Sequence, residues 1–247
     1  MRLKSSYVFT GFLIALGAFP AAAAGIDVYP STTSLADTQG TVVGNPSSAP
    51  GFGDGGSWQA TGAKTNYYIT PQDLFGHGVL ISEISSITYW TDQLATAGNW
   101  NLYIYTTPSG AGDSKSWYRS VLVGVTPDGA AGWNQNSTNS ALYFTDPNRN
   151  NTTYSTTIAL ANLQAGAVTW PASGTSWDYR NESVEYFSIQ TDSGATAFRG
   201  LVDGLTVNLN GGATASVNFE AVAPEPATWS LLVIGLGLVG IGRRYRR

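Results

Sequence analysis

Short segments in which apolar and polar residues alternate recur through most of this 247-residue chain. In LTVNLN, Leu205, Val207 and Leu209 fall on one side of an extended backbone, and Thr206 and Asn208 fall on the other. WNLYIYT and ASVNFEA repeat the pattern, and runs such as TPDGAAG and LNGGA separate these segments. A period of two is that of a half-buried β-strand, and Gly, Asn and Asp mark turns. The chain is therefore predicted to be all-β.

The near-regular spacing of these short segments favours two packed antiparallel sheets. We predict a β-sandwich of the jelly-roll or concanavalin-like kind, with an open barrel as the alternative. One segment, ISEISSITYW, is ambiguous because Ile81, Ile84 and Ile87 repeat every three residues, as on a helix face. Its β-branched residues favour a strand that carries a bulge. Residues 25–63 are polar and glycine-rich and predict an edge strand with long loops.

The N-terminus has the three parts of a secretory signal peptide. MRLK is basic, SSYVFTGFLIALGAFP is apolar, and AAAAG supplies small residues. Ala22 and Ala24 stand where signal peptidase needs small side chains, so residues 1–24 are predicted to be removed. A retained signal anchor is the alternative. The exported domain is then expected to span residues 25–223.

Charge and cysteine content exclude several classes of function. The chain has no cysteine, which removes disulfides, thiolate metal sites and cysteine nucleophiles. Between Gly25 and Ala223 there are 15 acidic and 6 basic residues, a net charge of −9, although the whole chain carries only −4. An acidic domain repels nucleic acid and anionic lipid, so neither is an expected partner of the domain.

The chain ends in VAPEPATWSLLVIGLGLVGIGRRYRR. Residues 227–242 carry no charge and, as a helix of about 24 Å, come close to spanning the ~30 Å hydrocarbon core of a membrane. The arginines beyond them favour the cytoplasmic side of the inner membrane. Pro224 and Pro226 keep the preceding segment extended and accessible. The sequence thus predicts a C-terminal transmembrane helix.

The proline–acid–proline triplet, the apolar helix and the basic tip, in this order, resemble the PEP-CTERM sorting signal of Gram-negative bacteria, a tail also called an ice-binding protein C-terminal domain. The resemblance implies recognition by an exosortase, a membrane protease that cuts near the triplet. It also implies an exported protein of the cell surface or biofilm matrix in a bacterium that makes extracellular polysaccharide. An uncut single-pass anchor is the alternative. The sorting signal covers residues 224–247, with Pro224, Glu225, Pro226, Arg243, Arg244, Arg246 and Arg247 as its motif residues.

The residues needed for hydrolytic catalysis are sparse. His77 is the only histidine, and no G-x-S-x-G elbow is present, so a loop histidine is favoured over a catalytic triad. Glu182 and Glu185 are three residues apart, which places them on opposite faces of a strand. They would then not flank one glycosidic bond. A non-catalytic domain is predicted, with a polysaccharide-active hydrolase that uses paired carboxylates as the alternative.

One turn contains oxygen ligands suited to calcium. In TDPNRNN, Asp146, Asn148 and Asn150 stand at alternate positions. The segment lacks the glycine and the closing glutamate of an EF-hand loop, so an Asx-rich turn is favoured. No other cofactor is expected.

Aromatic residues supply the remaining signal, with 8 tryptophans and 13 tyrosines in the chain. Flat rings beside amide and carboxylate groups are typical of surfaces that bind sugars, although sandwich cores also use tryptophan. The domain is accordingly expected to bind or organise extracellular polysaccharide, with a purely structural matrix protein as a further alternative. The predicted glycan contacts are Trp58, Trp117, Trp133 and Trp177.

Overall fold

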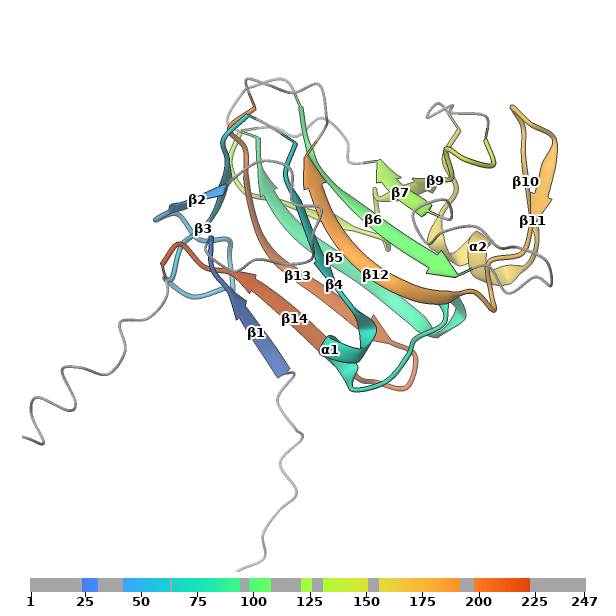
Figure 1. Ribbon diagram of the computed structural model, residues 1–247, viewed down its shortest axis with the longest axis horizontal. Helices are drawn as coiled ribbons and strands as arrows, with labels where there is room; N and C mark the ends of the chain where they lie inside the picture. The colour runs from blue at the N-terminus through green and yellow to red at the C-terminus, as the bar shows by residue number, and fades with distance from the viewer. Residues whose placement is uncertain are drawn as a thin grey trace, which may run out of the picture.

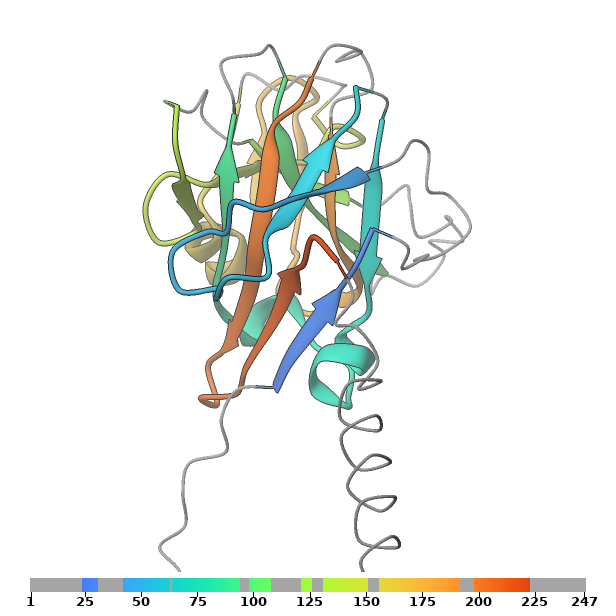
Figure 2. The ribbon, with the colours of Figure 1, turned by 90° about the vertical axis from the view of Figure 1, so that its left-hand side faces the viewer.

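The computed structural model describes residues 24–30, 42–62, 64–93, 98–107, 121–125, 131–150, 156–191 and 198–222. These residues form two large sheets that pack face to face, which confirms the predicted β-sandwich (Figure 1). In Figure 2 the larger sheet faces the viewer, with the smaller sheet behind it. In the part of the chain that the structure describes, no helix is both long and apolar enough to cross a membrane. The predicted transmembrane segment lies outside these residues.

The larger sheet has seven strands, and the first and last strands of the domain are neighbours in it. β1 pairs with β14 in parallel, whereas the other pairs in this sheet are antiparallel. The path runs β1-β14-β13-β3-β2, and β5 joins the other edge of β13 and pairs with β8. The strands are β1 (Ala24–Val28), β2 (Val42–Asn45), β3 (Ser57–Ala60), β5 (Ile84–Asp92), β8 (Asn134–Ser137), β13 (Leu201–Leu209) and β14 (Thr214–Phe219).

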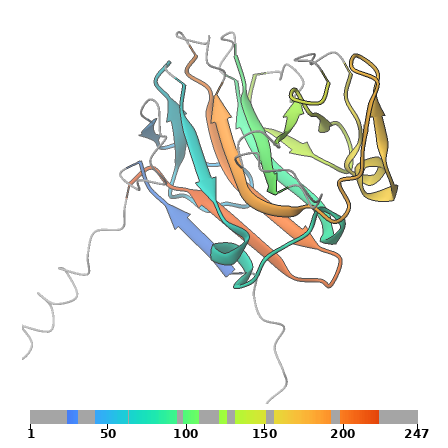
Figure 3. The same cartoon turned by 45° about the vertical axis from the view of Figure 1, so that its right-hand side comes forward.

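The smaller sheet has five strands in the order β4-β12-β6-β7-β9. Beside it stands a separate hairpin, β10–β11, with the short helix α2 (Figure 3). Two further turns, α1 and the 3₁₀ helix η1, connect β4 to β5. The bounds are β4 (Asn66–Ile69), α1 (Pro71–Phe75), η1 (Ile81–Glu83), β6 (Trp100–Thr107), β7 (Val121–Val125), β9 (Tyr143–Thr145), α2 (Leu160–Ala165), β10 (Val168–Trp170), β11 (Thr175–Trp177) and β12 (Ser183–Thr191).

The core forms where the inward residues of both sheets meet, as the period of two predicts. Leu205 and Val207 point inward, whereas Thr206 and Asn208 stay half-buried on the outer face. Several polar atoms of the core find partners inside it. The indole nitrogen of Trp100, for example, donates to the carbonyl oxygen of Gly200 over 2.9 Å.

The ambiguous isoleucine segment contains a 3₁₀ turn followed by a strand with the predicted bulge. Ile81 lies in η1, and the register between β5 and β13 shifts beside Ile84. This shift inserts one residue into β5, so that Ile84 and Ile87 both point inward. The three-residue spacing therefore reflects a bulged strand rather than a helix face.

Along one edge, β13 changes its partner strand at Asp203 and Gly204. Before this point that edge pairs with β3 and after it with β14, so the sheet forks. The buried Asp203 carboxylate fills the fork by accepting the backbone N–H groups of Ala49 at 3.0 Å and Phe219 at 3.2 Å. Gly204 has a φ of +60°, and any side chain there would overlap the ring of Phe52. The Asp203 side chain at the fork therefore holds the last residue of β14, Phe219, in place.

Candidate functional site

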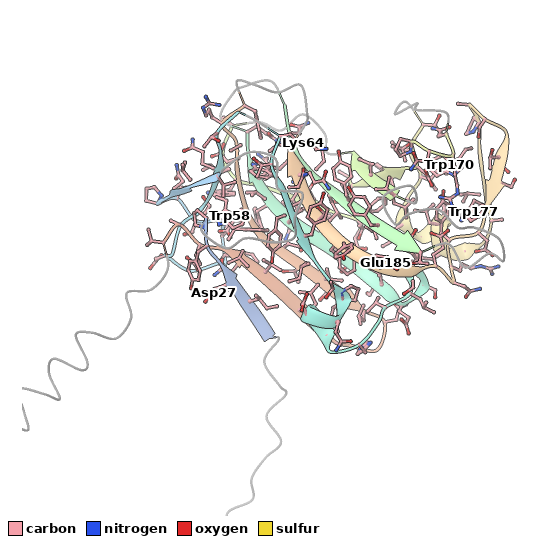
Figure 4. The ribbon with its side chains drawn as sticks, in the orientation of Figure 1. Asp27, Trp58, Lys64, Trp170, Trp177 and Glu185 are labelled. Carbon is pink, nitrogen blue, oxygen red and sulfur yellow. The ribbon has the colours of Figure 1, made fainter. Side chains whose placement is uncertain are left out.

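The predicted tryptophan contacts do not form one surface. Figure 4 shows Trp58 at one end of the molecule and Trp177 at the other. Trp58 lies on β3, is 3% exposed, and packs against Tyr67 and Phe219 with ring centroids 5.6 and 5.0 Å away. The structure therefore places Trp58 in the core and not on the surface that a glycan contact requires, because the alternation along β3 points its side chain inward.

Two other predicted contacts are half-buried and already have partners. Trp177, on β11, donates its indole N–H to Glu182, and its ring centroid lies 3.9 Å from the Arg149 guanidinium carbon. Trp133 precedes β8, and its indole nitrogen donates to Ser47 Oγ over 3.1 Å. The ring of Trp133 borders the seven-stranded sheet. Trp117 lies outside the described residues.

Trp177 belongs to a buried charged cluster that joins the β10–β11 hairpin to the sandwich. Arg149 lies 2.6 Å from the Asp146 carboxylate and 3.8 Å from that of Glu182. Both carboxylates are fully buried. Burial is the largest single effect and lowers the pKa of Arg149, but attraction and hydrogen bonding to Asp146, together with attraction to Tyr179 and Glu182, outweigh it, and the net shift is upward. Arg149 is thus held as a cation between two acids and an aromatic ring.

Hydrogen bonds occupy both carboxylates of this cluster. Tyr179 donates its hydroxyl to Asp146 over 2.8 Å and accepts the indole N–H of Trp170, also at 2.8 Å. Glu182 accepts from Thr106 as well as from Trp177. Burial raises the pKa of Glu182, and these donors partly offset the effect. Because the hydrogen bonds of both carboxylates are made within the protein, this network fits a structural link between the hairpin and the sandwich better than a substrate site.

The turn proposed for calcium is part of the same cluster. One oxygen of Asp146 accepts the backbone N–H groups of Asn148 and Arg149 at 2.9 and 3.0 Å, and the other accepts from Arg149 and Tyr179. Asn148 is exposed, whereas Asn150 is buried. Among the described residues, no three His, Cys, Asp or Glu side chains gather as a metal site would require. The geometry favours the Asx-turn interpretation.

The carboxylates considered for catalysis lie apart. Glu182 accepts a hydrogen bond from Thr106 and Glu185 accepts one from Thr107, and these neighbouring threonines point to opposite faces of β6. Glu182 and Glu185 are therefore on opposite sides of the sheet, as the spacing predicted. His77 is exposed, with Nδ1 2.7 Å from the carbonyl oxygen of the next residue. These groups do not converge on one bond.

The outer face of the seven-stranded sheet carries an ordered array of uncharged polar groups, here called the hydroxyl–amide ladder. Thr206 and Ser216 hydroxyls lie 2.9 Å apart across β13 and β14. Asn208 donates to Ser86 over 2.9 Å and accepts from Thr214 over 2.8 Å. Since strands are about 4.8 Å apart, these groups repeat regularly across the sheet. The ladder comprises Ser86, Thr88, Thr206, Asn208, Thr214 and Ser216.

A half-buried tryptophan lies on the same face. Trp90 follows Thr88 at the two-residue spacing of β5 and stands opposite Gln135 of β8. Trp90 is not among the contacts predicted from the sequence, because a tryptophan within a strand is commonly a core residue. The alternation of β5 was the signal that would have placed Trp90 beside the ladder. This face thus combines a flat ring with aligned hydroxyl and amide groups.

The outer face of the five-stranded sheet is also aromatic, and two of its tyrosines are buried. Tyr68 and Tyr105 are each only 7% exposed, and their ring centroids lie 5.8 Å apart. Gln190 donates to the Tyr105 hydroxyl over 2.8 Å. Tyr103 and Tyr186 pack against this pair. These tyrosines form a second small core, so the ladder is the better candidate for a binding surface.

The residues assigned to sorting lie at or beyond the ends of the described chain. Ala24 is the first residue of β1, and Ala22 precedes the described residues. Val222 is the last described residue, so Pro224, Glu225, Pro226 and the four terminal arginines lie outside them. The geometry therefore does not test the assignments of cleavage and sorting residues.

Comparison with known proteins identifies this C-terminal segment. Residues 222–247 match the family model of the PEP-CTERM protein-sorting motif, which confirms the resemblance of the tail. No curated protein and no solved structure matches the chain. The chain thus carries the sorting signal of an exosortase substrate, which supports an exported protein with a membrane-anchored processing intermediate.

Proposed function

We propose that this protein is an exported, non-catalytic module that binds polysaccharide, and that its binding face is the hydroxyl–amide ladder beside Trp90. The motif supports delivery across the inner membrane and handling by an exosortase. The cell surface or extracellular matrix of a Gram-negative bacterium is the place of action that we propose. Signal peptidase is the second processing enzyme that this route requires.

The observation that carries the proposal is the chemistry of the ladder face. Sugars present hydroxyl groups around an apolar ring face, and proteins bind them by hydrogen bonding together with stacking on aromatic rings. The ladder offers groups that both donate and accept, and Trp90 lies next to them. A repeating array across strands suits a polymer with repeating hydroxyl groups.

The charge of this face favours a ligand without acidic groups. The six ladder residues carry no charge, and acids border them on the same sheet face: buried Asp203 stands opposite Trp90, Asp92 follows Trp90 on β5, and Asp27 lies on β1. Carboxylates at the borders of a neutral face repel a polyanion. A neutral, hydroxyl-rich polysaccharide is therefore the proposed ligand class.

The binding proposal predicts that Trp90→Ala and Thr206→Val each weaken the affinity of the domain for the host's extracellular polysaccharide by about tenfold. Each removes one interaction worth about 1–2 kcal/mol, a stacked ring or a hydroxyl partner. Thr206→Val keeps the shape and the strand preference of the side chain. The measurement is titration calorimetry, or retardation in gels that contain the polymer, on domains whose circular dichroism matches the wild type.

Thr169→Val is the matched control, because Thr169 on the β10–β11 hairpin also pairs with a serine hydroxyl across two strands, 2.6 Å away. It should bind like the wild type. Equal affinity of the ladder variants and the control would reject the ladder as the site. A wild-type domain without affinity would instead favour the structural matrix protein, and release of reducing ends from the polymer would favour the hydrolase.

A further inference from the structure

Hydrogen bonds hold the chain against the folded domain as far as Ala221, the residue before the matched sorting motif. The backbone N–H of Glu220 donates to the carbonyl of Val28 over 2.8 Å, and that of Ala221 donates to the carbonyl of Gly55 over 2.9 Å. The next residue, Val222, is 75% exposed and is the first to leave the surface. Glu220 and Ala221 are here called the C-terminal strap.

Three glycines form the seat of this strap. A side chain at Gly44 would overlap the backbone carbonyl of Ala221, and one at Gly56 would overlap the Ala221 methyl group. A side chain at Gly55 would meet the Glu220 carboxylate. The three positions, on β2 and in the loop before β3, therefore allow the strap to approach the backbone closely. This glycine seat comprises Gly44, Gly55 and Gly56.

The seat leaves a short spacer before the PEP triplet. Only residues 222 and 223 lie between the strap and Pro224. Fully extended, the chain from Ala221 to Pro224 spans at most about 11 Å. Proteases generally bind an extended stretch of substrate on both sides of the bond that they cut. A processing enzyme that acts near the triplet therefore meets the surface of the folded sandwich.

We infer that the glycine seat restrains processing of the sorting motif, by fixing Ala221 and so limiting how much extended chain the exosortase can engage. Efficient processing then requires transient release of the strap. The strap is held by two backbone hydrogen bonds and close glycine contacts, so release is a local opening that leaves the core intact. This role rests on the sorting motif rather than on polysaccharide binding, because the seat contains none of the six ladder residues.

Pulse-chase labelling in the host, with the ratio of precursor to mature protein as the readout, tests this inference. Gly44→Ala should displace the Ala221 carbonyl, loosen the strap, and raise the processing rate about tenfold, the equivalent of ~1.4 kcal/mol. Gly78→Ala is the matched control, because nothing lies within 4 Å of a side chain there and its backbone is not left-handed. The control should be processed at the wild-type rate.

A second variant keeps the test decisive if Gly44→Ala perturbs folding. Insertion of Ser-Gly after Val222 lengthens the spacer without touching the seat, and should also speed processing several-fold. Unchanged or slower processing of both variants would overturn the inference. Acceleration by the insertion alone, with Gly44→Ala folded and cut at the wild-type rate, would show that spacer length matters and the seat does not, which also overturns it.

Discussion

Replacing Arg149 by methionine is expected to lower the free energy of unfolding by about 3–5 kcal/mol, the usual effect of removing one partner from a buried ion pair. The Asp146 and Glu182 carboxylates are fully buried, and Arg149 is the cation that lies between them. Methionine fills much of the same volume, so the loss reflects uncompensated charge more than a cavity. Urea unfolding followed by tryptophan fluorescence measures it.

Arg180→Met is the matched control for this experiment. Arg180 also pairs with an aspartate, Asp178, but the pair is exposed and solvent screens it. Its removal should leave the unfolding midpoint unchanged within error. If Arg149→Met lowers the free energy of unfolding as little as Arg180→Met does, the assignment of the buried cluster as a stabilising link to the β10–β11 hairpin is contradicted.

Stability is also expected to fall as the pH rises from about 4 to about 6, because of Asp203. Burial raises the pKa of Asp203 to about 6 from a reference value of 3.8, although its backbone N–H donors act in the opposite direction. A raised carboxyl pKa means that the folded state holds the proton more tightly than the unfolded state does. The stabilisation is therefore present below pH ~4 and is lost through pH ~6. The difference corresponds to about 3 kcal/mol.

Comparison with Asp203→Asn isolates this contribution. The amide does not ionise, so the slope of unfolding free energy against pH should become flatter between pH 4 and 7. Glu182 and Glu220, whose pKa values are also raised, remain in both proteins and cancel in the comparison. The amide also turns one N–H donor toward that of Ala49, so the variant should be less stable at low pH. A slope equal to that of the wild type would assign the pH dependence to other groups.

The layers of the fold could be predicted because alternation is a local property. Leu205 and Val207 point inward as their spacing requires, and the bulge near Ile84 follows from β-branching against a three-residue repeat. Strand partners are not local, however. Nothing in the sequence of residues 24–28 indicates that they pair in parallel with β14. Period alone also does not show that Trp58 points inward, since β3 is only four residues long.

The candidate site illustrates the same limit. Nothing in the sequence indicates that Asp146, Arg149 and Glu182 meet, and only the fold brings residues 146–149 and 182 into one buried cluster. The outward position of Thr206 and Asn208 was predictable, but their alignment with Ser86 and Ser216 depends on register between distant strands. The sorting motif could be recognised from the sequence because it is contiguous, and the family match confirms it.

The parallel pairing of β1 with β14 sets an order of events during export. A polypeptide that crosses the membrane with its N-terminus leading delivers β1 first, yet among the described residues the strand that pairs with β1 is β14, which ends at Phe219. The seven-stranded sheet can therefore close only when the residues just before the PEP triplet have come through. The domain thus completes its folding at about the time when the sorting motif reaches the membrane.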